Sequence, residues 1–347
     1  MEPSLNRHSR LPVPGDFVSG ADPLLRLVGH SESVIRLHDR IQAVSQRNST
    51  VLLRGESGVG KELVAQQIHC ASRRAGGPFV AVDCSTLRDT LFESQLFGHV
   101  KGAFTGAQYP TLGFWRAANG GTLFLDEIGE LAPPMQAKLL RCLQDRAVIP
   151  VGGVDPIPVD VRVITATHRN LEEMVRRGEF REDLYFRIKV VRLDVPPLRE
   201  RMSDVPELAR YFLARLSALY HEPIKTLDDS ALAALMSYDW PGNVRELANA
   251  IEYAHVLSPG HTLTAADLPE EIRAAGAKRQ FPGPDQIIPL DAAERALILR
   301  ALTATHGNQA RAAQLLQIER RRLYRKVHQY GLESFTVRRV APHGRTA

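Results

Sequence analysis

One glycine-rich stretch constrains this chain more than any other, and it reads Gly55-Glu56-Ser57-Gly58-Val59-Gly60-Lys61-Glu62. It follows the apolar run Val51–Leu53 and precedes the helix-forming run Leu63–Ile68, so the predicted order is strand, turn and helix. Backbone N–H groups in such a turn converge on an anion, and the start of the helix adds partial positive charge. Lys61 would then reach the outer phosphates of a nucleotide. A loop that only turns the chain is the alternative, and the strict P-loop pattern has Ser or Thr in place of Glu62.

A second apolar strand ends in two acids that a nucleotide site requires. The run Gly120–Leu125 is followed by Asp126 and Glu127, and Asp126 lies 65 positions after Lys61. At a strand tip beside the P-loop, we expect Asp126 to hold Mg²⁺ and Glu127 to orient and polarise the attacking water. The alternative is that these acids cap a helix.

Strand-like and helical runs alternate from Leu24 to about Val195, which predicts an α/β fold with a mostly parallel sheet. Residues 205–275 read as helical, and Asn243 followed by Glu246 is typical of an N-cap and its third helical residue. The expected strands are 50–53, 79–82, 122–125, 161–166 and 190–193. The expected regions are a flexible leader 1–23, an α/β subdomain 24–195, a helical subdomain 196–275, a linker 276–289, a C-terminal domain 290–332 and a basic tail 333–347.

The positive charge of the chain lies in its last sixth. Residues 291–347 hold 11 Lys and Arg against 4 Asp and Glu, whereas the rest holds 33 against 35. Three short helices are expected there, the first capped by Asp291, and Leu323 and Val327 would face their shared core. This layout is typical of a DNA-binding helix-turn-helix, although a solvated basic tail is the alternative. The basic residues expected to face DNA are Arg320, Arg321 and Arg322 for base edges, and Arg325 and Lys326 for phosphates.

Composition excludes other classes of protein. The 347 residues are 44% hydrophobic, which suits two or three globular domains. No apolar run reaches 18 residues and no signal peptide is recognisable, so we expect no membrane span. Cys70, Cys84 and Cys142 lack metal-ligand spacing and are interpreted as free thiols in a reducing cytoplasm.

Between the two nucleotide motifs lies Gly102-Ala103-Phe104-Thr105-Gly106-Ala107. Its glycines predict a flexible turn, and an exposed Phe104 between them indicates a contact element. A Phe104 packed under its own loop is the alternative.

Together these stretches resemble the sigma-54-dependent transcriptional activators, which are bacterial enhancer-binding proteins of the AAA+ ATPase class. The resemblance covers residues 25–272, and residues 307–332 resemble a Fis-type helix-turn-helix. The family also has Glu after the P-loop Lys, so Glu62 fits. The matching stretches are 55–62, 102–107, 120–127, Pro196-Pro197-Leu198-Arg199-Glu200-Arg201 and Trp240-Pro241-Gly242-Asn243-Val244-Arg245-Glu246-Leu247.

The resemblance implies a P-loop AAA+ ATPase with a parallel sheet core, a helical lid and a C-terminal all-α helix-turn-helix domain. It implies that ATP and Mg²⁺ bind at the P-loop and Asp126, that Arg181 and Arg187 are arginine fingers for a neighbouring subunit, and that Arg245 is the lid sensor. The Gly102–Ala107 loop would contact sigma-54. The implied partners are an upstream DNA site, sigma-54 with RNA polymerase, and further copies of the chain, from a dimer to a hexameric ring.

The chain departs from the family pattern at the nucleotide sensors. The family usually has Asn at the positions of Asp83 and His168, and His168 follows Thr167 in the sensor strand. If Asp83 and Glu127 approach within hydrogen-bonding distance, the two carboxylates would compete and could share one proton. With Asp83 ionised, repulsion would push Glu127 toward the attacking water and weaken the restraint on idle hydrolysis. The alternative is that Asp83 pairs with a nearby cation or faces solvent. The other departures are Gly113-Phe114-Trp115-Arg116 and Gln317, where the family usually has Gly-Arg-Phe-Glu and Gly.

The leading interpretation is an ATP-driven activator of sigma-54 RNA polymerase. A repressor that uses its ATPase module only to oligomerise, or a remodeller of another substrate such as a helicase loader, are the competing interpretations. About 23 residues precede the ATPase region, too few for a regulatory domain. Control by a separate protein in trans, control by expression level, and truncation of the chain are all compatible with this.

Overall fold

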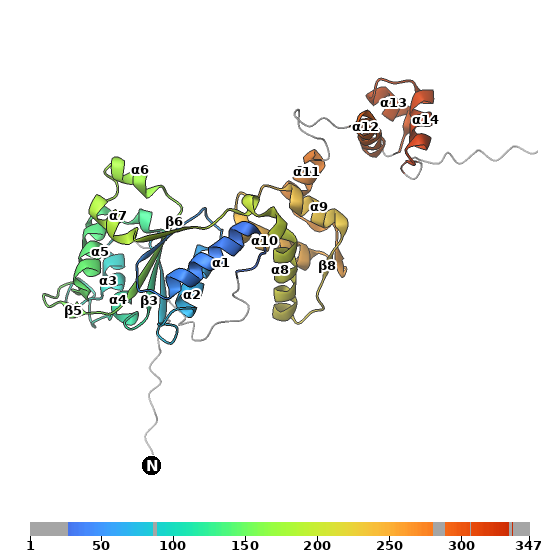
Figure 1. The fold of residues 1–347 in the computed structure, drawn as a ribbon. Coiled ribbons are helices and arrows are strands. Elements are labelled where there is room, and N and C mark those ends of the chain that lie inside the picture. Colours follow the sequence, from blue (N-terminus) through green and yellow to red (C-terminus); the bar gives the residue numbers. More distant parts are fainter. Residues whose placement is uncertain (1–26, 86–88, 280–288, 306, 333–334, 336–347) are drawn as a thin grey trace, which may run out of the picture. The chain divides into compact units, whose positions relative to one another are not determined.

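The computed structural model describes residues 27–85, 89–279, 289–305, 307–332 and 335 (Figure 1). The expected leader, most of the expected linker and nearly all of the basic tail lie outside this range. The chain divides into two compact units, and each is described by itself. The first comprises the residues up to Asp228 together with Asp239–Leu268, and the second comprises Asp229–Tyr238 and the residues from Pro269 onward.

A five-stranded parallel sheet forms the centre of the first unit, in the order β2-β3-β6-β1-β7. All five expected strands are confirmed, with ends shifted by one residue. Parallel strands are buried on both faces, which is why each reads as a nearly continuous apolar run. The strands are β1 (Val51–Arg54), β2 (Phe79–Asp83), β3 (Thr122–Asp126), β6 (Arg162–Thr167) and β7 (Val191–Asp194).

Helices cover both faces of this sheet (Figure 1). Alternate residues of β1 face opposite ways, so Val51 and Leu53 pack with α1 and α2, whereas Leu52 joins the core under α3, α5 and α7. The helices are α1 (Glu32–Ser45), α2 (Lys61–Cys70), α3 (Asp89–Phe97), α4 (Phe114–Ala117), α5 (Pro133–Asp145), α6 (Leu171–Arg176) and α7 (Glu182–Ile188). A short hairpin, β4 (Ala147–Val148) with β5 (Ile157–Pro158), follows α5.

The rest of the first unit is mainly helical, as expected, with one short strand pair that was not expected. Helix α8 (Val205–Tyr220) packs on α10 (Asn243–Leu257), and β8 (Thr226–Leu227) pairs with β9 (Thr262–Leu263). The expectation that Asn243 caps α10 is wrong. Asn243 is the first helical residue, has φ +55°, and follows the N-cap Gly242, whose N–H donates to Glu246.

The second unit contains the basic domain. Helices α12 (Leu290–Ala304), α13 (Gln309–Leu315) and α14 (Arg320–Gln329) enclose a core that includes Leu323 and Val327, as expected. Asp291 does not cap α12, because the helix starts one residue earlier, after Pro289. Gln317, which replaces the usual Gly, has φ +52° in the turn before α14. The unit also holds α9 (Asp229–Ser237) and α11 (Glu270–Arg279).

Within the described residues, no helix is both long and apolar enough to cross a membrane.

Candidate nucleotide-binding site

The P-loop lies between the end of β1 and the start of α2. Gly58 and Gly60 have φ +78° and +99°, values that L-residues with a side chain rarely adopt. A Cβ on Gly58 would also lie 2.3 Å from the carbonyl oxygen of Gly242. Glycine is therefore required here both by the backbone conformation and by the close approach of a second segment.

Lys61 is the first residue of α2, and its side chain is buried in the loop. Its Nζ lies 3.1 Å from the carbonyl oxygen of Gly55 and 3.3 Å from that of Glu56. It also lies 3.2 Å from Oε1 of Glu127, across the sheet edge. The structure thus brings Lys61 and Glu127 together, as the sequence predicted for one site.

The two acids at the end of β3 have opposite pKa shifts. Burial raises the pKa of Asp126, and the charge of Lys61 only partly offsets this effect. Burial also acts to raise the pKa of Glu127, but hydrogen bonds from His168 and the charge of Lys61 outweigh it, so this pKa lies below its usual value. Glu127 is therefore ionised at neutral pH, which is the state that a general base requires.

Asp126 is suited to hold Mg²⁺. Its Oδ1 accepts the N–H of Glu127 at 2.9 Å, and its other oxygen has no hydrogen bond within the described residues. A partly buried carboxylate of this kind favours a hard cation. Mg²⁺ often takes one or two carboxylates and completes its shell with water and substrate phosphates, so a dedicated protein cage is not needed. The described residues contain no cluster of three or more His, Cys, Asp or Glu side chains that could hold a metal ion.

The sensor positions give Glu127 a partner that the sequence did not identify. Nδ1 of His168 lies 2.7 Å from Oε2 of Glu127, and the backbone N–H of His168 donates to the same oxygen at 3.2 Å. Asp83 pairs in register with Asp126, but its Oδ1 accepts the N–H and hydroxyl of Ser85. Glu127 therefore contacts His168 and Lys61. The expected effect of Asp83 on Glu127 stays a prediction.

Helix α10 contacts the P-loop directly. The N–H of Arg245 donates to the carbonyl oxygen of Gly58 at 3.2 Å, and its guanidinium donates to Oγ of Ser57 at 3.1 Å. The cavity between them has a volume of about 350 Å³. It is lined by residues that include Ser57, Gly58, Gly60, Lys61, Glu62, Asp126, Glu127 and Arg245, together with Phe212, Val244 and Ala248.

Asn243 is a site residue that sequence reasoning missed. Its side chain is fully buried, and its Nδ2 donates to Oε2 of Glu56 at 3.1 Å and to the carbonyl oxygen of Ser57 at 3.0 Å. Its Oδ1 accepts the N–H of Leu198 at 2.8 Å. Glu56 in turn forms a bidentate ion pair with Arg199. The sequence feature that could have indicated this position is an Asn directly after Pro-Gly, because Asn tolerates the left-handed backbone conformation better than most other residues with a side chain.

The two expected arginine fingers lie outside this cavity. Arg181 precedes α7, is exposed and pairs with Asp183 at 2.7 Å. Arg187 is near the end of α7, is exposed and donates to the carbonyl oxygen of Leu143 at 2.9 Å. Neither contacts the P-loop of its own chain.

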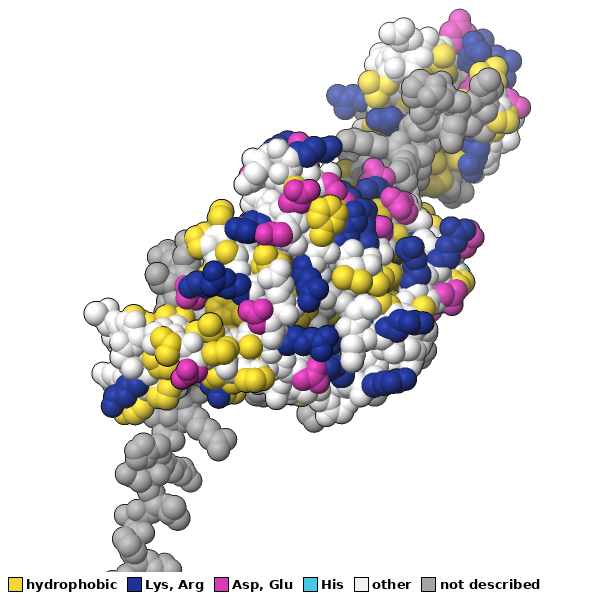
Figure 2. Space-filling model, turned by 60° about the vertical axis from the view of Figure 1, so that its left-hand side comes forward, with side chains coloured by type: hydrophobic (Ala, Val, Ile, Leu, Met, Phe, Trp, Pro, Cys, Tyr) yellow, Lys and Arg dark blue, Asp and Glu magenta, His cyan; other side chains and the backbone are white. Residues whose placement is uncertain are grey.

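The Gly102–Ala107 loop is a closed turn on the surface. The N–H of Gly102 donates to the carbonyl oxygen of Ala107 at 2.8 Å, and Phe104 is 40% exposed with its ring against His99. His99 is held by Ser94 and by the carbonyl oxygen of Tyr109. Figure 2, in which the left-hand side of Figure 1 comes forward, shows hydrophobic side chains gathered at the lower left. The exposed apolar residues of this region are Val100, Phe104, Tyr109, Leu112, Ile149 and Val154.

In the helix-turn-helix, the expected base-reading arginines are all exposed, but Lys326 has an internal partner. Its Nζ lies 2.7 Å from Oε2 of Glu294 on α12, and the hydroxyl of Tyr330 donates to the same oxygen. Lys326 therefore joins α14 to α12, whereas Arg320, Arg321, Arg322 and Arg325 face solvent.

Three families match successive parts of the chain. The Sigma-54 interaction domain matches residues 27–194, the AAA+ ATPase lid domain matches residues 199–283, and the Fis family of bacterial regulatory proteins matches residues 289–330.

Comparisons with individual proteins agree with these family matches. The chain is 46% identical over 301 residues to the transcriptional regulatory protein ZraR of Klebsiella oxytoca, which covers 87% of this chain and 68% of that protein. It is 45% identical over 305 residues to the Nif-specific regulatory protein of Azotobacter vinelandii, covering 86% and 57%. A crystal structure of NtrX from Brucella abortus in complex with ATP aligns with TM-score 0.68 and 35% identity, covering 88% of this chain and 70% of that one. The chain therefore belongs to the sigma-54-dependent transcriptional activators, AAA+ ATPases that combine a sigma-54 interaction domain, an AAA+ lid and a Fis-type helix-turn-helix.

Proposed function

We propose that this chain binds an upstream DNA site, assembles into a ring and hydrolyses ATP to convert the closed promoter complex of sigma-54 RNA polymerase into an open one. The observation that carries this proposal is the joint presence, in one compact unit, of the Lys61–Glu127 site and a surface loop with an exposed Phe104. The NtrX structure with bound ATP supports the nucleotide assignment.

Each residue at the P-loop has a separate role in hydrolysis. Lys61 and the loop N–H groups bind the phosphates, and a bound phosphate would compete with Glu127 for the charge of Lys61. Glu127, released in this way and ionised, accepts a proton from the attacking water. Asp126 would hold Mg²⁺, which neutralises phosphate charge when bound.

The decisive test is open-complex formation in vitro, with purified sigma-54 RNA polymerase, a supercoiled sigma-54 promoter and ATP. We expect permanganate-reactive thymines at the start site only when ATP and this protein are both present. Hydrolysis and DNA binding without an open complex would favour the competing repressor function.

Replacing Phe104 with alanine should separate the two activities. Phe104 lies outside the nucleotide cavity, so Phe104→Ala should leave ATP turnover within about twofold of wild type and abolish open-complex formation. The matched control is Tyr109→Ala, because Tyr109 is 78% exposed and only its backbone oxygen holds His99. Equal loss of both activities in Phe104→Ala would show that the loop is structural.

The helix-turn-helix should bind as a dimer to two half-sites about one helical turn apart. Arg321→Ala should relax sequence preference at one position per half-site. Arg325→Ala should weaken binding to all sequences and lower the slope of affinity against salt by about one unit. Lys326→Ala should change this slope less, because Glu294 already pairs with its charge. Footprints at several salt concentrations measure all three, and a single protected half-site would contradict the dimer.

A further inference from the structure

A second polar pocket lies at the opposite edge of the sheet from the P-loop. Asn48, Ser49 and Thr50 precede β1 and border the pocket, and so do the residues that lead into β6. Since β1 has four residues and rises about 3.3 Å per residue, roughly 13 Å of strand separates the pocket from the P-loop. Its volume is about 250 Å³, enough for a phosphate-sized anion.

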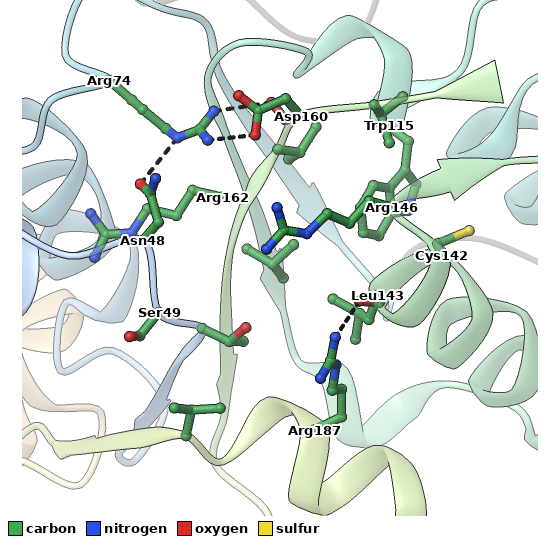
Figure 3. Close-up of a pocket in the computed structure, with 15 residues that line it drawn as sticks. Asn48, Ser49, Arg74, Trp115, Cys142, Leu143, Arg146, Asp160, Arg162 and Arg187 are labelled. Atoms are coloured by element: carbon green, nitrogen blue, oxygen red, sulfur yellow. Dashed lines mark hydrogen bonds and ion pairs between the residues drawn. The ribbon is translucent and has the colours of Figure 1, made fainter.

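Arginines dominate this pocket (Figure 3). Arg74, Arg146, Arg162 and Arg187 line it, and Asp160 is the only acid among its lining residues. Arg74 pairs with Asp160 at 2.6 Å and also bonds Asn48, so this pair forms a wall of the pocket. The remaining arginines leave an excess of positive charge.

Arg162 adds buried positive charge beneath the pocket. It is 1% exposed, and its guanidinium donates to the carbonyl oxygens of Val44 and Ser45 at the end of α1. No carboxylate bonds to it within the described residues, and burial lowers its pKa to about 10. It remains a cation at neutral pH, without a counter-ion in contact.

Among the four arginines of this pocket, Arg146 gives the strongest evidence for a binding function. It ends α5 with φ +48°, a left-handed conformation that costs a residue with a side chain about 1–2 kcal/mol. Glycine would fit this position without that cost. Figure 3 shows the Arg146 side chain reaching across the middle of the pocket. The residue is exposed, its charge adds to the hydrogen bond from Arg74 in lowering the pKa of Asp160, and its guanidinium has no hydrogen bond within the described residues. A guanidinium that lies in a pocket without a hydrogen-bonded protein partner can donate to an anion.

Arg187 lies below Arg146 in the same pocket, and its guanidinium uses one nitrogen on the carbonyl oxygen of Leu143. Two guanidinium groups that face one cavity can bind the oxygens of a phosphate group together. Trp115, Val159 and Val163 supply an apolar wall that excludes water from one side.

We propose that Arg146 joins Arg187, already expected as an arginine finger, in a second anion site, which binds a phosphate group at the amino-terminal edge of the sheet. The phosphate has two chemical sources. It belongs either to a free phosphate compound or to the nucleotide held by a neighbouring copy of the chain, and the second source rests on the ring proposed above. In both cases Arg146 is a binding residue that acts outside the P-loop of its own chain.

Direct binding tests the free source. The Lys61→Ala variant disables the P-loop, and inorganic phosphate is titrated into it in a calorimeter, with chloride at equal ionic strength as the blank. We expect a saturable heat change, with binding at least tenfold weaker after Arg146→Gly and partly restored by Arg146→Lys. Glycine suits the left-handed backbone, so Arg146→Gly should fold. The matched control is His221→Gly, at the left-handed C-cap of α8, which should bind phosphate like the parent.

ATP turnover tests the neighbour source. Arg146→Gly alone should lower kcat at least tenfold with little change in KM, and mixing it with Lys61→Ala subunits should restore part of the activity, because some interfaces then pair an intact Arg146 with an intact P-loop. Phosphate binding without rescue of turnover in mixed rings assigns a free phosphate compound, whereas rescue in mixed rings assigns the nucleotide of the neighbouring copy. If Arg146→Gly matches His221→Gly in both, the anion site does not exist. If wild-type protein shows no ATP turnover, the proposed ATPase fails, and the phosphate titration alone then decides for or against the site.

Discussion

Replacing Glu127 with glutamine is expected to lower ATP turnover by roughly 10²- to 10⁴-fold, the usual contribution of a positioned general base. Glutamine keeps the size of the side chain and one acceptor oxygen, but it cannot take a proton from water. Because Glu127 is a charge partner of Lys61, the neutral side chain should not weaken nucleotide binding, and removing this competitor should strengthen it. Turnover is measured by phosphate release, and affinity by a fluorescent ATP analogue.

The matched control is Glu130→Gln, three residues further along. Glu130 pairs with Arg169 at 2.8 Å, and it does not line the nucleotide cavity. It should keep turnover within about threefold of wild type. If Glu127→Gln hydrolyses ATP at the wild-type rate, another group activates the water, and the assignment of Glu127 is wrong.

Alanine at Arg181 or Arg187 is expected to reduce turnover by a factor of the order of 10³, as for an arginine finger supplied in trans. Both side chains are exposed and distant from their own P-loop, so removing them should leave the affinity of the isolated subunit for ATP unchanged. Asp183→Asn is the control for Arg181, because it breaks the ion pair and keeps the guanidinium.

Mixed rings separate action in trans from a local defect. An Arg181→Ala subunit has an intact P-loop, and a Lys61→Ala subunit has intact fingers. Mixing them creates interfaces that contain both, so turnover should rise above that of either variant alone. No increase at any mixing ratio would mean that the arginines act within their own chain.

The sequence predicted the features that depend on local pattern. The five central strands could be predicted because each is an apolar run buried on both faces, and the P-loop because its glycines, lysine and flanking elements lie within one short stretch. Leu323 and Val327 were placed in the core correctly because a four-residue spacing fixes one face of a helix.

Features that depend on the meeting of distant segments could not be predicted. The local pattern indicated that Asn243 caps a helix. Its side chain instead forms hydrogen bonds with Glu56, Ser57 and Leu198, which lie at least 45 positions away in the sequence. Lys326 looked like a phosphate contact until the fold placed Glu294 beside it. In the same way, no pattern placed Arg146 and Arg187 in one pocket, since the end of α5 and the end of α7 come together only in the folded chain.

The buried contacts of Asn243 have a kinetic consequence. Helix α10 holds the P-loop backbone at Ser57 and Gly58 through hydrogen bonds from Asn243 and Arg245, so α10 cannot tilt away unless these bonds break. Departure of ADP past α10 would then carry the activation cost of breaking them. We therefore expect the residence time of ADP, and with it the time before one subunit can bind a new ATP, to depend on the amide of Asn243, a side chain that does not line the nucleotide cavity.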